Sequence, residues 1–154
     1  MKKGFTLIEV LLVIGIIAVL AAGIIIALNP GRQFARTRDT QRVTHLNDIL
    51  KAIFQNITEN SGKFVCQSAD ANNNGDALDD IPTASPLVIA TSGYNIAPCL
   101  VPTYMTRLPV DPSTGVWNST SSYNTNYTIQ RDAATGRIIL RANGELNPNI
   151  EVSQ

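Results

Sequence analysis

Residues 1–28 read MKKGFTLIEVLLVIGIIAVLAAGIIIAL, and this stretch decides the fold. From Val10 to Leu28 it contains only Val, Leu, Ile, Ala and Gly, with no charged or hydrogen-bonding side chain. As a helix rising about 1.5 Å per residue, this run spans roughly 28 Å, close to the hydrocarbon core of a bilayer. Because lipid offers no hydrogen-bond partner to the backbone, we predict a membrane-spanning helix.

Glu9 is the one carboxylate at the start of this apolar run. An acid inside a membrane helix costs roughly 3 kcal/mol on insertion scales, so it indicates a function and a partner. In one interpretation Glu9 lies near enough to the helix end to reach the headgroups. In the other it pairs with a cation, since a buried amine and a buried carboxylate are tolerated together.

The segment Gly4–Glu9, followed by its apolar run, resembles the leader and N-terminal helix of type IV pilins and type II secretion pseudopilins. The resemblance implies that residues 1–4 are a leader peptide, which a prepilin peptidase removes between Gly4 and Phe5. Phe5 would then be N-methylated. Glu9, as the fifth mature residue, would neutralise the terminal amine of a neighbouring subunit during assembly.

The composition describes one small domain behind this anchor. Of 154 residues, about 95 to 120 remain for a soluble domain. The formal charge is zero, and loss of Lys2 and Lys3 with the leader leaves ten basic against twelve acidic residues. Such a balance gives no general attraction to nucleic acid. Few charges and many Asn, Thr and Ser are typical of a domain outside the cytoplasm.

Two cysteines fit that compartment. Cys66 and Cys99 would close a loop of about 34 residues, worth about 3–4 kcal/mol in the chain-entropy model. We predict this disulfide, the alternative being two free buried thiols.

A second helix follows the anchor. Pro30, between Asn29 and Gly31, predicts a kink or break where the bilayer ends. Helical spacing then resumes, and residues 32–61 form an amphipathic helix capped near Gly62. Its expected apolar stripe contains Val43, Leu46, Ile49, Leu50, Ile53, Phe54 and Ile57, and its expected polar face contains Arg42, His45, Asp48, Lys51 and Gln55. With residues 5–29 as the transmembrane or filament-core helix, the N-terminal helix has about 50 residues.

The remaining residues, 62–154, predict a loop-rich head with a small sheet. Residues 87–91 are a strand candidate, and residues 127–131 and 137–142 predict a hairpin around 132–136. Arg107–Pro112 resembles the Leu-Pro-x-Asp-Pro turn that precedes the sheet in many pseudopilins. The expected fold class is α+β, a long N-terminal helix packed on a small antiparallel sheet, as in pilins.

The segment 70–80 has the spacing of a calcium loop. Oxygen-bearing side chains occupy loop positions 1, 3, 5 and 7, with glycine at 6, but position 12 is Ile81. The alternative is a solvated Asx-rich turn. The candidate Ca²⁺ ligands are Asp70, Asn72, Asn74, Asp76, Asp79 and Asp80.

A basic cluster follows the apolar run, formed by Arg32, Arg36, Arg38 and Arg42. It would meet lipid headgroups, acids of neighbouring subunits, or DNA. A positive-inside count would keep this side in the cytoplasm, whereas the leader places it outside. His45 has no second ligand at metal spacing, and the serines 119–122 have no activating base nearby. We therefore predict that this protein is not an enzyme.

The sequence therefore favours a subunit that polymerises into a type IV pilus. It would lie in the cytoplasmic membrane as precursor, contact an inner-membrane assembly platform, and end in an extracellular homopolymer. The alternatives are a pseudopilin of type II secretion or competence, a DNA-binding tip pilin, and an anchored calcium-binding surface domain.

Overall fold

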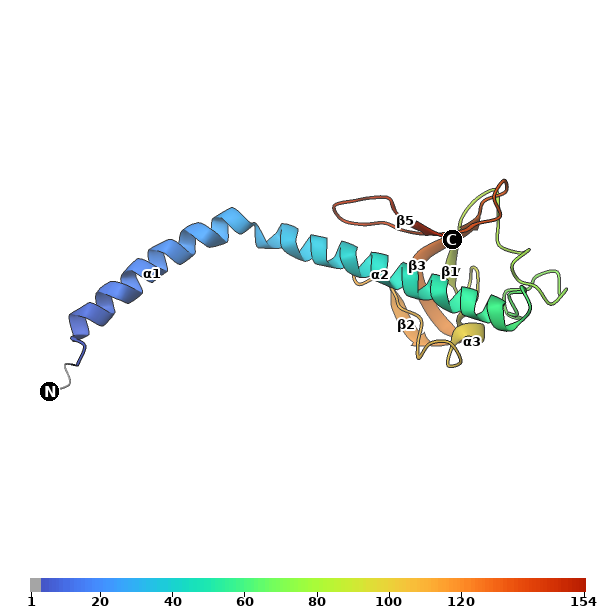
Figure 1. Cartoon of the computed structure of the whole chain (residues 1–154), viewed down its shortest axis with the longest axis horizontal. Coiled ribbons are helices and arrows are strands. Elements are labelled where there is room, and N and C mark those ends of the chain that lie inside the picture. Colours follow the sequence, from blue (N-terminus) through green and yellow to red (C-terminus); the bar gives the residue numbers. More distant parts are fainter. Residues whose placement is uncertain (1–3) are drawn as a thin grey trace.

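The computed structural model describes residues 4–154 and separates a bare helix from a packed head (Figure 1). Helix α1, Leu7–Leu28, extends away from the rest of the molecule. Its window Leu7–Ile24 is long and apolar enough to cross a membrane by length and composition, and none of it is buried. The apolar surface of this window therefore has no cover within the described part of the chain.

Asn29 separates α1 from α2, Pro30–Glu59. Its backbone is left-handed, with φ 43°, which ends α1. Its side chain accepts a hydrogen bond from the backbone N–H of Arg32 at 3.4 Å, which caps α2. Pro30 is the first residue of α2, where its missing N–H leaves no helical bond unmade. One asparagine and one proline thus produce the bend that Figure 1 shows between the two helices.

The head is a five-stranded antiparallel sheet covered by α2. Its strands are β1 (Leu87–Ala90), β2 (Val116–Ser119), β3 (Ser122–Arg131), β4 (Ile138–Ala142) and β5 (Ile150–Ser153). The order is β1-β3-β4-β5, and β2 also pairs with β3. A short helix, α3 (Ala97–Leu100), lies between β1 and β2. This arrangement confirms the expected α+β class, including the β3–β4 hairpin with Arg131 opposite Ile138.

The core lies between α2 and the sheet. Leu46, Ile49 and Ile53 of the helix are fully buried, as are Ile129 and Leu140 of the strands. The period of 3.6 residues on α2 and of two on the strands brings these side chains together. The disulfide Cys66–Cys99, with Cα atoms 5.2 Å apart, ties the loop after α2 to α3 and confirms the predicted pairing.

Three side chains of α2 differ from the expected pattern. Val43 is 40% exposed although the spacing placed it in the core, and Arg42 is buried although its charge placed it in solvent. His45 is half-buried, and its Nδ1 lies 2.9 Å from the hydroxyl of Tyr127. The buried face is rotated relative to the prediction because Arg42 is in helical phase with the fully buried Leu46, Ile49 and Ile53, which follow it by four, seven and eleven residues.

Candidate functional site

Gly4 and Phe5 precede the first turn of α1 and are exposed, and residues 1–3 of the predicted leader lie outside the described residues. Thr6 and Glu9 form a capping box at this helix start. Glu9 N–H donates to Thr6 Oγ1 at 3.3 Å, and Glu9 Oε2 accepts from the N–H and hydroxyl of Thr6, each at 3.2 Å. Because both contacts to the carboxylate use the same oxygen, the other oxygen is open to a further donor.

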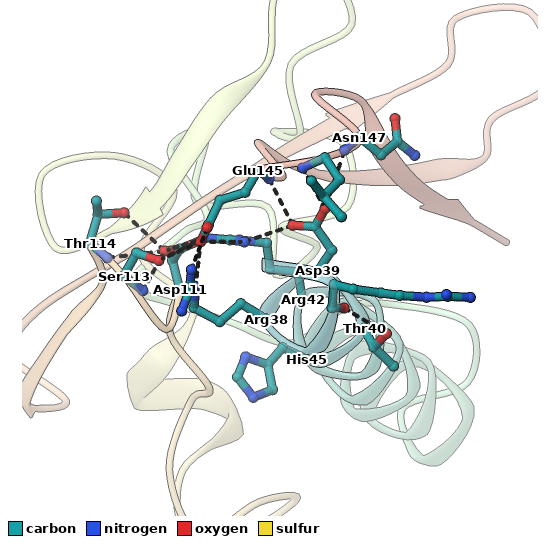
Figure 2. A network of polar contacts seen from close by, with 12 residues as sticks. Arg38, Asp39, Thr40, Arg42, His45, Asp111, Ser113, Thr114, Glu145 and Asn147 are labelled. Carbon is teal, nitrogen blue, oxygen red and sulfur yellow. Dashed lines mark hydrogen bonds and ion pairs between the residues drawn. The ribbon is translucent and has the colours of Figure 1, made fainter. Parts of the chain in front are cut away.

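A second polar site joins α2 to the head around Arg42, whose side chain is 3% exposed. Its Nε donates to Asp111 Oδ2 at 2.6 Å and its Nη2 to Asp111 Oδ1 at 3.2 Å. Nη1 donates to Asp39 at 2.8 Å and to Glu145 at 3.4 Å, and Nη2 also reaches the Ser113 hydroxyl at 3.0 Å. Figure 2 shows these groups converging from α2, the loop before β2 and the loop before β5. All three guanidinium nitrogens are therefore used within the chain.

Asp39 fixes the loop 143–149 to α2 (Figure 2). Its carboxylate accepts the backbone N–H groups of Glu145 at 2.8 Å, Leu146 at 2.9 Å and Asn147 at 3.2 Å. Gly144 allows the loop to come this close, since a Cβ there would lie 2.8 Å from Asp39 Oδ1 and 2.3 Å from the Asn147 carbonyl oxygen. This loop therefore lies along α2, although most of its residues remain exposed.

The carboxylates of this network are held ionised. Burial alone would raise the pKa of Asp39, but the three backbone N–H groups and Arg42 hold it below its ordinary value. Burial opposes ionisation of Asp111 as well, and hydrogen bonds from Arg42, Ser113 and Thr114 lower its pKa. Arg38, which binds Glu145 through two nitrogens, lowers the Glu145 pKa to about 2. The hydrogen bond to Asp111, above all, raises the pKa of Arg42.

Two of the four clustered arginines are thus neutralised internally, whereas Arg32 and Arg36 are exposed. Within residues 4–154 neither of these two forms an ion pair. Both line a groove of about 890 Å³ between the first half of α2 and the loop 143–149. The other residues lining the groove are Asn29, Gln33, Asp39, Thr40, Val43, Leu146, Asn147 and Ile150.

The oxygens of the loop 70–80 mostly accept hydrogen bonds from its own backbone. Asp70 accepts from the N–H groups of Asn74 and Gly75 at 3.1 and 2.7 Å, and Asn72 also accepts from that of Asn74 at 3.0 Å. The N–H of Asp76 is bound by Asn74. These are the bonds of an Asx-rich turn, the alternative that the sequence allowed.

The acids at the end of this loop have other partners. The carboxylate of Asp76 caps the N–H groups of Phe64 and Leu78, Asp80 contacts the N–H of Asn72, and Asp79 pairs with Arg131 at 3.0 Å. Among the residues with described side chains, no group of three or more His, Cys, Asp or Glu is arranged to hold a metal ion. Calcium binding here stays a prediction.

The buried ionic network was missed at the sequence level, although one signal was present. Arg42 precedes Leu46 by four residues and Ile49 by seven, which places it on the core stripe. An arginine at a core position, in a chain that has an Asp-containing turn elsewhere, indicates that the two charged groups form a buried ion pair. The prediction assigned Arg42 to the polar face because of its charge, although its spacing placed it on the core face.

The comparison with known families agrees with the geometry of the N-terminus. Residues 1–25 match the prokaryotic N-terminal methylation motif. This motif, the class III prepilin leader, is typical of type IV pilins and pseudopilins, which are structural proteins and not enzymes. No curated protein and no solved structure matches the chain at a significant level. The motif and the α+β fold together make this a type IV pilin-like protein.

We expect the head to lose stability in acid because these carboxylates titrate. Their folded pKa values lie below the ordinary value, so their contribution is complete above about pH 5 and is lost as pH falls through the folded values, that of Glu145 being about 2. Asp111→Asn should lower the free energy of unfolding by about 3–5 kcal/mol at pH 7, since it leaves the buried Arg42 without its main partner. It should also make that free energy depend less on pH in acid, because one titrating carboxylate has been removed. The measurement is the free energy of unfolding of the mature chain in detergent between pH 2 and 7.

Asp132→Asn is the matched control. Asp132 caps Ala134 N–H, Thr135 N–H and the Thr135 hydroxyl, the same three kinds of group that Asp111 caps, but accepts no arginine. Its substitution should have a much smaller effect. Equal losses in the two variants would show that the ion pair with Arg42 contributes nothing beyond the turn.

Proposed function

We propose that this chain is a structural subunit of a type IV pilus, cut between Gly4 and Phe5, methylated on Phe5 and polymerised through α1. The main support is that the helix within the methylation motif is apolar and that its window Leu7–Ile24 is uncovered. Phe5, Leu7 and Ile8 are 85, 82 and 74% exposed, and the large side chains through Ile24 are more than half exposed. Such a surface is stable in lipid before assembly and among copies of itself afterwards.

Glu9 has a different hydrogen-bond partner in each of these two environments. In a lone subunit its carboxylate is bound by Thr6 of its own chain through one oxygen. In the filament the free oxygen receives the methylated amine of Phe5 from a neighbouring copy. Since either charge alone is costly in an apolar bundle, the pair favours the correctly seated subunit over a displaced one.

The contact between copies is head-to-tail, because one end of a subunit meets a different part of the next. Contacts of this kind do not close on themselves and yield open fibres. A prepilin peptidase and an inner-membrane assembly platform act before and during this step. The precursor lies in the cytoplasmic membrane and the filament outside the cell.

The alternative is a pseudopilin of type II secretion or competence. The methylation motif is shared by both classes, and the turn Leu108–Pro112 resembles that of many pseudopilins. A DNA-binding tip pilin is less well supported, because Arg38 and Arg42 are paired within the chain. Surface fibres built mainly of this chain favour the pilus, and loss of secretion without such fibres favours the pseudopilin.

The processing of the N-terminus tests the proposal. We expect mass spectrometry of the chain in sheared surface filaments to find N-methylphenylalanine at position 5 and no residues 1–4. The physical reason is that an intact leader keeps Lys2 and Lys3 beside the apolar bundle, where they cannot be buried. An uncut N-terminus on a monomeric surface protein would contradict the proposal and favour the anchored calcium-binding domain.

Glu9→Ala tests the assembly role separately. We expect cells to process and insert this variant but to raise far fewer filaments than the wild type, because a neighbour's amine then has no partner. Thr6→Val is the control, since it removes the side-chain contact to Glu9 without removing the charge. Filaments of Glu9→Ala at wild-type amounts would show that Glu9 does not drive assembly.

A further inference from the structure

We propose that the groove beside Arg32 and Arg36 binds the acidic loop 70–80 of a second copy of this chain. The inference rests on the proposed filament function and adds a polar contact between heads to the contact between apolar helices. The groove, at the end of the head next to α1, has a volume of about 890 Å³. Its two arginines are exposed and form no ion pair within the described chain.

The opposite charge lies at the other end of the head. Residues 64–106 contain four acids, Asp70, Asp76, Asp79 and Asp80, and no lysine or arginine. The loops that carry them follow the far end of α2, away from α1 (Figure 1). Burial first, and then Asp80, Asp76 and Asp70, raise the pKa of Tyr94, so these three carboxylates lie near the same side chain. Asp79 shares its charge with Arg131 but is still about half exposed.

The shape of the loop also suits the groove. Its tip, residues 71–75, consists of Ala, three Asn and Gly, all exposed. Their side chains are small, and the amides can bond to polar groove residues such as Gln33 and Asn147. The arginines would meet Asp79 and Asp80, which follow this tip. Opposed charges at such a contact select partner and register more than they add affinity.

The distance between the two patches sets the register of the copies. Arg32 and Glu59 are separated along α2 by about 40 Å at 1.5 Å per residue. In a filament of parallel subunits, the acidic tip of one copy therefore reaches the groove of a copy displaced by about this distance along the axis. Each copy uses both patches, so the contact propagates without closing.

Charge reversal tests the contact. We expect Arg32→Glu with Arg36→Glu to reduce the yield of sheared filaments about tenfold or more, and Asp79→Lys with Asp80→Lys to do the same. The four substitutions together restore attraction and should recover most of the wild-type yield. The control is Lys51→Glu with Arg137→Glu, which reverses two exposed charges outside both patches and should leave the yield unchanged. Formation of the Cys66–Cys99 disulfide in the membrane fraction checks that each variant folds.

The outcomes separate this inference from the function on which it rests. Wild-type chains that form no filament and keep residues 1–4 would overturn the proposed function itself. Normal yields from the arginine variant, in cells whose wild-type filaments form, would overturn only the groove contact. Loss in both two-site variants without recovery in the four-site variant would also overturn it, and would assign Arg32 and Arg36 to lipid headgroups instead.

Discussion

The apolar surface of α1 is the constraint on which the rest of the structure depends. Burial of apolar surface contributes about 25 cal/mol per Å², so exposing the large side chains of α1 to water has a high free-energy cost. The head covers none of the window Leu7–Ile24. The chain therefore always needs an external apolar phase, which is lipid for the precursor and other copies in the proposed filament.

The head, in contrast, buries its own core, and polar side chains on the buried face of α2 bind the loops around it. Arg42 holds the turn at Asp111 near the middle of the helix. Near its end, buried Asn56 donates to the Val65 carbonyl and accepts from the Val65 N–H, at 3.1 and 2.9 Å. The apolar residues between them pack on the sheet.

The sequence predicts those parts of the fold that have a strong period. The run Val10–Leu28, the hairpin that the second half of β3 forms with β4, and the break before Pro30 each follow from local rules that the structure obeys. The first half of β3, residues 122–126, was not predicted. Strands β2 and β5 were missed because each has only four residues and little alternation of buried and exposed side chains. Such strands depend on their neighbours in the sheet more than on their own sequence.

The polar site was harder to predict for a related reason. Asp39 and Glu145 are 106 residues apart in sequence, and no local pattern indicates that the loop of one lies on the helix of the other. The basic cluster was predicted as one surface, but ion pairing within the chain divides it into the paired Arg38 and Arg42 and the exposed Arg32 and Arg36. The position of Arg42 on the buried face of the helix explains this division, and its spacing from Leu46 and Ile49 already indicated that position.

Removal of α1 shows whether this helix is what requires an apolar environment. Residues 29–154 and the mature chain 5–154 can be compared by analytical ultracentrifugation in buffer without detergent. We expect the shorter chain to be a soluble monomer with an intact Cys66–Cys99 disulfide and cooperative unfolding, and the longer chain to associate or precipitate. A monomeric, soluble mature chain would show that the helix needs neither lipid nor neighbours.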